Sequence, residues 1–273
     1  MHLNNFIQRA ANIDDLAGFA KSCLGDDEEL GAPLGSSGIV FCRTKVETES
    51  LCIELNKRGI ITRAYHAGLE VFFLLLSDIF CSYLLYQEVE RVHVQELWMA
   101  GTVPVITATV SFGMGVDRGP VRFVAHWSVP ACISSYYQES GRAGRDGKLS
   151  YARLYYSYSD REMLSSLMRR EVERAEGNRK EELKARHTSF KILIQYAESV
   201  RNCRHAIFSC YFGDHVTDCE DACNVCVNPD SAEKRLRDYQ SGLVFEPNQD
   251  EETLAASKAK RELNNLISRK FRM

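Results

Sequence analysis

Short apolar runs alternate with amphipathic segments along the first 160 residues of the chain. The runs are rich in β-branched and aromatic residues and predict buried strands, whereas the segments between them place apolar residues at helical spacing. The predicted strands are residues 38–42, 61–66, 103–107, 121–127 and 152–157, and the predicted helices are residues 14–23, 44–57 and 134–141. This alternation predicts an α/β fold, a parallel sheet with helices on its faces.

Four polar loops are expected to meet at one edge of that sheet. They are Arg43-Thr44, His66–Gly68, Thr109–Asp117 and Gln138–Gly147. In open parallel sheets the chemistry gathers in loops beyond the carboxyl ends of the strands. The sequence therefore predicts a single functional edge.

The pattern becomes helical after residue 157. Ser159 and Glu162 have the spacing of a capping box, and apolar residues follow at helical spacing at Leu164, Leu167, Met168 and Val172. A second helix is predicted over residues 181–200, with Leu183, Phe190, Leu193, Ile194 and Ala197 facing inward. From residue 230 the chain is charged and poorly periodic, which predicts a largely disordered tail.

These changes divide the chain into four parts. Residues 1–37 are an N-terminal helix and loop, 38–158 the sheet domain, 159–229 a helical module and 230–273 the tail. A length of 273 residues with 45% hydrophobic content suits one or two globular domains.

Charge and targeting signals add little to this picture. The net charge is −3, so the protein as a whole has no positive field of the kind that would indicate nucleic-acid binding. Residues 161–191 hold nine bases against six acids, a balance most often found on a solvated helix face.

Met1–Phe6 has neither a basic start nor an apolar run, so no signal peptide is expected. The apolar segment Val71–Tyr86 has sixteen residues and contains Asp78, which is too short and too polar for a membrane span of about twenty residues.

Four of the ten cysteines crowd together as C-x15-C-x3-C-x2-C, at Cys203, Cys219, Cys223 and Cys226. Four thiolates can close a tetrahedral shell around Zn²⁺, and such a closed site is structural. Two disulfides or four coincidental thiols are the alternatives, and disulfides fit a chain without an export signal less well. His205 or His215 could replace one cysteine. Cys210 lies on the apolar stretch 206–212 and is interpreted as a core thiol.

A glycine-punctuated segment, YYQESGRAGRDG at residues 136–147, carries Arg142 and Arg145. The glycines allow the backbone to approach a ligand closely, and the two guanidinium groups present bidentate forks suited to phosphate. Composition alone would equally allow surface ion pairs between these arginines and Glu139 or Asp146.

The full string is more specific than its composition, because Q-x-x-G-R-x-G-R is helicase motif VI. The segment QESGRAGRDG resembles the RecQ family of ATP-dependent DNA helicases in particular. Three upstream segments resemble motif V, motif IV and the segment that follows motif IV in that family: ATVSFGMGVD at 108–117, GIVFCRT at 38–44 and YHAGL at 65–69. With the cysteine cluster, the resemblance covers roughly four-fifths of the chain, and the spacing favours the shorter animal branch of the family.

The resemblance implies a RecA-like second motor lobe followed by a zinc-binding module. Arg145 matches the arginine finger that reaches the γ-phosphate of ATP, and Arg142 its phosphate-contacting neighbour. Gln138 matches a coupling residue of the same motif, and Asp117 would orient motif V toward Arg145. Loop residues that in related proteins follow the phosphates of a DNA strand are Arg43, Thr44, Thr107, Thr109 and Ser111. Such contacts bind without reading sequence.

Two features depart from the family pattern. No G-x-x-x-x-G-K-[ST] loop and no DExH box occur in these 273 residues, so ATP and Mg²⁺ are expected only with a first lobe that this sequence does not contain. Residues 71–92 are longer and more apolar than the family's connection, and they are interpreted as an intron translated in error or as a divergent insertion.

The expected function follows from these features. The chain is expected to be part of a 3′-to-5′ DNA helicase in repair and recombination, located in the nucleus and with the cytoplasm left open. It is expected to hold a structural zinc ion, with single-stranded or forked DNA and the first lobe as partners, and no membrane. The alternative is a non-catalytic DNA- or protein-binding module without ATPase activity.

Overall fold

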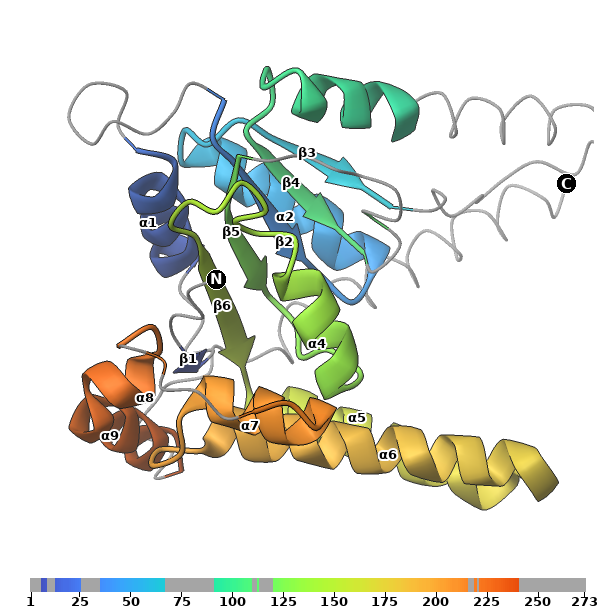
Figure 1. Cartoon of the computed structure of the whole chain (residues 1–273). Coiled ribbons are helices and arrows are strands. Elements are labelled where there is room, and N and C mark those ends of the chain that lie inside the picture. Colours follow the sequence, from blue (N-terminus) through green and yellow to red (C-terminus); the bar gives the residue numbers. More distant parts are fainter. Residues whose placement is uncertain are drawn as a thin grey trace, which may run out of the picture.

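The computed structural model describes residues 6–8, 13–25, 35–66, 91–109, 112, 120–215, 219 and 221–240 (Figure 1). Ser111, Asp117 and the segment 71–86 therefore lie outside the described residues. No helix in the described part of the chain is long and apolar enough to cross a membrane.

The described strands form one sheet of six, and every neighbouring pair is parallel. In chain order the strands are β1 (Phe6–Gln8), β2 (Ser37–Phe41), β3 (Thr62–Tyr65), β4 (Val105–Ala108), β5 (Val121–His126) and β6 (Tyr151–Tyr156). Their order across the sheet is β1-β6-β5-β2-β4-β3. The central strands β2, β4 and β5 are buried at every position, as strands covered by helices on both faces must be.

Helices cover the two faces of the sheet, which confirms the expected α/β layering (Figure 1). On one face, α1 (Ile13–Leu24) and α2 (Lys45–Lys57) pack Leu16, Phe19, Leu51 and Leu55 against β2, β4 and β5. On the other face lie a helix at residues 91–99, which buries Trp98, and α4 (Ile133–Ser140). Each of these helices was predicted from sequence except the one at 91–99.

The helical module continues from the last strand. It consists of α5 (Tyr158–Arg174), α6 (Gly177–Glu198), α7 (Arg204–Phe212), α8 (Asn224–Val227) and α9 (Pro229–Gln240). Phe190, Leu193 and Ala197 of α6 are buried in one core with residues of α4 and β6. The module and the sheet domain therefore share apolar packing at the carboxyl end of β6.

Three details of the helical prediction were wrong. The cap of α5 is Ser157, whose Oγ accepts a hydrogen bond from the Asp160 N–H at 3.1 Å, because the helix begins directly where β6 ends. Ser159 therefore lies inside the first turn. Leu167 is exposed although Met168 is buried. The disordered tail was predicted to start at residue 230, but α9 occupies the first part of it.

Helix α9 begins with a local signal that periodicity did not show. The Oδ1 atom of Asn228 accepts a hydrogen bond from the Ser231 N–H at 2.8 Å, and Pro229 occupies the first helical position. Asparagine at the cap followed by proline is a favoured helix start. Ala232 is buried beside Cys219 and Cys223, so this helix closes over the cysteine cluster.

Candidate functional site

The arginine segment lies at the amino end of β5, not at the carboxyl edge of the sheet as predicted. Helix α4 runs back along β5, and the Gly144 N–H donates to the carbonyl of Val121, the first residue of that strand, at 3.0 Å. Arg43, Thr44, His66 and Thr109 follow the carboxyl ends of β2, β3 and β4, at the opposite end of the sheet. The structure thus separates the described residues of the expected loops into two groups.

Arg122 of β5 holds the arginine segment against the strand through hydrogen bonds. Its buried guanidinium donates to the carboxylate of Asp146 at 2.5 Å and to the carbonyl of Leu149 at 2.9 Å. Asp146 also accepts from the Lys148 N–H at 3.1 Å. The hydrogen bond from Arg122 holds the pKa of Asp146 below its ordinary value. The Asp146 carboxylate is thus bound to β5 through Arg122.

A second anchor joins the other end of β5 to α4. His126 and Glu139 are almost fully buried, and the His126 Nε2 atom lies 2.7 Å from a carboxylate oxygen of Glu139. The His126 ring also stacks on Phe41, with ring centroids 5.2 Å apart. Glu139 and Asp146, the acids that composition offered as partners for Arg142 and Arg145, thus bond to His126 and Arg122 of β5.

Two glycines give the segment its turn. Gly144 and Gly147 have φ angles of +71° and +74°, a region that side chains with a Cβ rarely adopt. A Cβ on Gly144 would also lie 2.3 Å from the Ser150 Oγ, whereas one on Gly147 would meet open space. The motif therefore requires glycine at position 144, because of the backbone conformation and the close approach of Ser150.

Arg142 and Arg145 lie close enough to influence each other. Arg142 is half-buried, Arg145 is exposed, and Gln138 lies exposed on α4 before them. Burial lowers the pKa of Arg142, the neighbouring charge of Arg145 lowers it further, and Glu139 opposes both effects. Two adjacent guanidinium groups on a fixed loop favour an anion, because it relieves their repulsion and accepts their hydrogen bonds.

Arg43 and Thr44 lie at the carboxyl end of β2, and Arg43 connects the sheet with the helical module. Arg43 forms an ion pair with Asp160 in the first turn of α5, with Nη1 and Oδ1 3.3 Å apart. Thr44 caps α2, since its Oγ1 accepts from the Glu47 N–H at 3.1 Å. Glu47 in turn accepts from the Ser128 hydroxyl at 2.6 Å. Thr44 is exposed and Arg43 partly so.

Two threonines at the end of β4 were predicted on the same DNA track, and the structure separates them. Thr109 is partly exposed beyond the strand. Thr107 is fully buried, and its hydroxyl donates to the Thr48 carbonyl at 3.0 Å, so its prediction as a DNA contact does not fit this structure. Because β4 is buried on both faces, neither side of the strand offers a residue to DNA.

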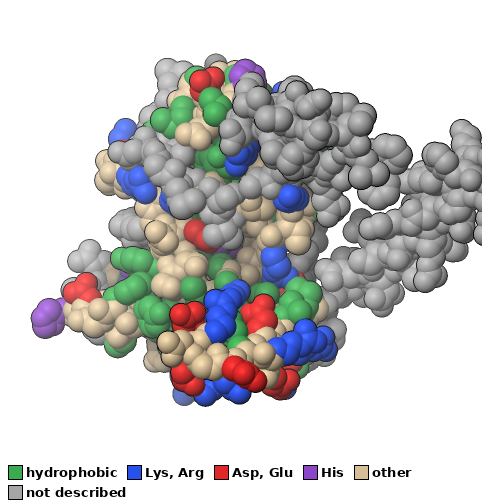
Figure 2. Space-filling model, turned by 90° about the vertical axis from the view of Figure 1, so that its right-hand side faces the viewer, with side chains coloured by type: hydrophobic (Ala, Val, Ile, Leu, Met, Phe, Trp, Pro, Cys, Tyr) green, Lys and Arg blue, Asp and Glu red, His purple; other side chains and the backbone are tan. Residues whose placement is uncertain are grey.

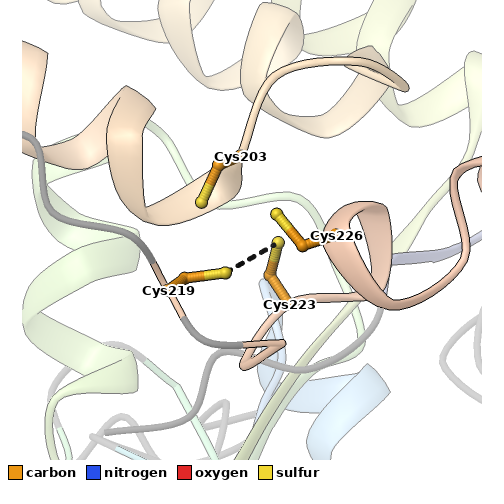
Figure 3. A group of neighbouring side chains, drawn as sticks. All are labelled: Cys203, Cys219, Cys223 and Cys226. Carbon is orange, nitrogen blue, oxygen red and sulfur yellow. Dashed lines mark hydrogen bonds between the residues drawn. The ribbon is translucent and has the colours of Figure 1, made fainter.

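The four predicted cysteine ligands come together in the helical module (Figure 3). Their sulfur atoms all lie within 4.8 Å of one another, and the Sγ atoms of Cys219 and Cys223 are 3.8 Å apart. A tetrahedron with Zn–S bonds of about 2.3 Å places its sulfur atoms about 3.8 Å apart. The donor set and its spacing therefore fit a tetrahedral thiolate-binding metal ion.

Local structure brings the four thiols together and favours the thiolate form of Cys223. Cys203 precedes α7, Cys223 precedes α8, and Asp221 takes a left-handed φ of +63° in the turn between Cys219 and Cys223. Burial raises the pKa of Cys223, but hydrogen bonds from His205 and the Arg204 backbone outweigh it and bring the pKa to about 5. Burial and the neighbouring thiols raise the pKa of Cys219 and Cys226, so Cys223 is the thiol of this group that is favoured as thiolate, the form that binds metal.

The neighbourhood of the cysteines corrects one prediction and adds two residues. Cys210 is exposed on α7 rather than in the core. Arg204 and His205 directly follow Cys203 and contact the cluster, and sequence reasoning considered His205 only as a substitute ligand. Their adjacency to a ligand was the one available signal.

The mildly basic stretch at residues 161–191 is a mixed surface. Figure 2 shows Lys and Arg side chains interspersed with Asp and Glu at the bottom of the molecule, where Figure 1 places α5 and α6. Exposed ion pairs there join Lys184 with Glu181 and Arg186 with Glu171. The interpretation as a solvated helix face is therefore favoured.

Two family domains match the chain. Residues 28–147 match the helicase conserved C-terminal domain, and residues 158–227 match the RecQ zinc-binding domain. The chain belongs to the RecQ helicase family. The RecQ zinc-binding match contains all four clustered cysteines, and the helicase match contains Arg142 and Arg145.

Three RecQ relatives illustrate the range of similarity. The mouse "ATP-dependent DNA helicase Q5" is 45% identical over 81% of this chain and 21% of its own length. The Caenorhabditis elegans "RecQ-like DNA helicase blm-1" is 34% identical over 92% of this chain and 23% of its own length. The Pasteurella multocida "ATP-dependent DNA helicase RecQ" is 33% identical over 76% and 29%. The chain thus spans between about a fifth and a third of the length of each of these three relatives.

Proposed function

We propose that this chain is the second motor lobe and zinc module of an ATP-dependent 3′-to-5′ DNA helicase that acts in DNA repair and recombination in the nucleus. The observation that carries the proposal is the arginine segment, which Arg122 and Gly144 fix at the amino end of β5, in a chain that also holds a packed four-cysteine module. The names of the RecQ relatives support the helicase activity, and the division into sheet domain (38–158) and zinc module (159–229) is part of the proposal.

In this proposal Arg145 is the arginine finger and Arg142 contacts phosphate. The rigid loop supports these roles, because guanidinium groups held in place need little reorganisation as charge develops on the transferred phosphoryl group. ATP and Mg²⁺ would be held by a first lobe, since the 273 residues contain neither a phosphate-cradling G-K-[ST] loop nor a DExH box. Gln138 would couple the segment to that lobe, and Asp117, outside the described residues, would orient motif V.

DNA would pass the carboxyl edge of the sheet. Arg43, Thr44 and Thr109 lie there with exposed or partly exposed side chains, and Ser111 would join them from outside the described residues. Contacts of this kind bind the backbone of a single strand without sequence preference. Thr107 is not included, because its hydroxyl is buried.

Zn²⁺ is the metal that the cysteine cluster would hold. Cys203, Cys219, Cys223 and Cys226 supply four sulfur ligands without an open position, which is the arrangement of a structural zinc site. The ion would tie the start of α7 to the turn before α8. It would thereby add folding free energy to the module, without taking part in ATP hydrolysis.

A reconstituted ATPase assay tests the proposal. The chain alone should show no turnover, whereas addition of a RecQ first lobe and single-stranded DNA should produce it. Arg145→Ala should then lower the rate by roughly 10³-fold or more. Arg179→Ala, at an exposed arginine of α6, is the matched control and should leave the rate unchanged.

Two results would overturn the proposal. Turnover by the chain alone would contradict the need for a first lobe. Binding of single-stranded DNA without any turnover in the reconstituted assay would instead support a non-catalytic DNA-binding module.

A further inference from the structure

Arg204 is a buried arginine placed directly after a predicted zinc ligand. It is 2% exposed and begins α7, and Cys203 is the residue before it. A permanently charged side chain is costly to bury unless its surroundings use the charge and all of its donors. Its partners therefore indicate what it does.

The guanidinium reaches two other parts of the cysteine module. Its Nε donates to Asn224 Oδ1 at 2.6 Å, and Asn224 lies between Cys223 and Cys226. Its Nη1 donates to the Tyr196 carbonyl, and its Nη2 lies 3.5 Å from the Ser199 carbonyl, both at the end of α6. One side chain thus joins α7, the Cys223–Cys226 turn and the end of α6.

The backbone of the same residue contacts a ligand. The Arg204 N–H donates a hydrogen bond to the Cys223 sulfur. Arg204 is therefore covalently next to one ligand and hydrogen-bonded to another. The side-chain bonds to Asn224 and to the end of α6 depend on the fork of the guanidinium, because its donors point in fixed, divergent directions that the ammonium of lysine cannot reproduce.

The charge of the residue also matches the site. Zn²⁺ with four thiolates carries a net charge of −2, which is opposite in sign to the charge of the guanidinium. A fixed positive charge beside such a group stabilises it in a low-dielectric setting.

We propose that Arg204 is a positioning residue for the zinc site. It holds Cys203 and the Cys223–Cys226 turn in register against the end of α6, and it offsets the negative charge of the metal–thiolate group. The inference rests on the proposed zinc site and is independent of the proposed helicase activity.

Metal binding by the full chain tests this role. Zinc affinity is measured by competition with a chromogenic chelator, and Co²⁺ absorption reports tetrahedral thiolate coordination. Arg204→Met should weaken zinc binding by about 10–100-fold, the usual effect of losing an outer-shell partner. Arg204→Lys keeps the charge but loses the fork, and its affinity should fall between that of Arg204→Met and wild type. Arg201→Met, at an exposed arginine two residues before Cys203, is the matched control and should bind zinc like wild type.

Asn224→Ala provides a second test if Arg204→Met fails to fold in excess zinc, as judged by far-ultraviolet circular dichroism. This variant removes the acceptor of the Nε hydrogen bond and should also weaken zinc binding. Affinities of Arg204→Met or, if that variant does not fold, of Asn224→Ala within twofold of wild type would overturn the positioning role. Wild type that binds no zinc at all would overturn the zinc site itself, and that failure is distinguishable because it precedes any comparison of variants.

Discussion

The guanidinium of Arg43 and the carboxylate of Asp160 lie 3.3 Å apart and join the end of β2 to the first turn of α5. The side chain of Asp160 is 9% exposed, so the pair is shielded from water on that side. Removing one charge from such a pair leaves the other without compensation in a poorly hydrated position. This contact therefore contributes to the connection between the sheet domain and the zinc module.

Asp160→Asn should lower the free energy of unfolding by about 1–3 kcal/mol, the range for losing a charged hydrogen-bond partner in a buried position. Asparagine keeps the shape and the backbone N–H that Ser157 caps, so the change isolates the charge. Urea denaturation measures the effect. Glu182→Gln breaks the exposed pair with Arg179 and should cost less than about 0.5 kcal/mol. Equal losses in the two variants would contradict the role of Asp160.

Gly144→Ala should destabilise the protein more than Gly147→Ala. Both positions have positive φ, which costs a Cβ-bearing residue about 1–2 kcal/mol. At Gly144 the new Cβ would additionally meet the Ser150 Oγ and the Lys148 carbonyl, so its loss should exceed that of Gly147→Ala by at least about 1 kcal/mol. Thermal and urea unfolding measured side by side check the difference, and a larger loss at Gly147 would refute it.

The sequence predicted the elements of the sheet domain because period and composition agree there. The predicted strand over 121–127 and helix over 44–57 correspond to β5 and α2 within one or two residues. Leu51 and Leu55 face inward as predicted. The clustering of the four cysteines was also predictable, because the C-x2-C turn and the neighbouring helix ends restrict where the thiols can lie.

The end of the sheet at which a loop lies and the exposure of single side chains were harder to predict than the helices and strands. The arginine segment was expected beyond the carboxyl end of a strand, but the length of α4 carries it back to Val121. Thr107 reads as a polar strand end, yet its hydroxyl is satisfied inside by Thr48. Cys210 lies in an apolar stretch but faces outward. Each of these depends on tertiary contacts, which a local pattern does not contain.

Cys132 should react with iodoacetamide before Cys52. Both thiols are partly exposed, so access is similar. Burial raises the pKa of Cys132, but hydrogen bonds from Ser134 and Ser135 outweigh it and bring the pKa below its ordinary value. Burial raises the pKa of Cys52, and its hydrogen bonds do not compensate. Because the thiolate is the nucleophile, Cys132 should be alkylated faster at neutral pH, and its rate should rise at lower pH than that of Cys52. Peptide mass spectrometry of zinc-loaded protein measures both rates, and faster alkylation of Cys52 would contradict the hydrogen-bond argument.

Cys223→Ala should remove the metal and loosen the helical module. Cys223 is fully buried and receives hydrogen bonds from His205 and the Arg204 backbone, so its loss leaves an incomplete shell around any ion. The melting temperature should fall by roughly 5–10 °C, which corresponds to a few kcal/mol in a chain of this size. Wild type treated with a chelator should melt like the variant, because both lack the metal. Cys210→Ala removes an exposed thiol from α7 and should keep one zinc ion and the wild-type melting curve. Calorimetry together with zinc analysis decides the matter, and a Cys223→Ala protein with unchanged zinc content and melting would exclude Cys223 as a ligand.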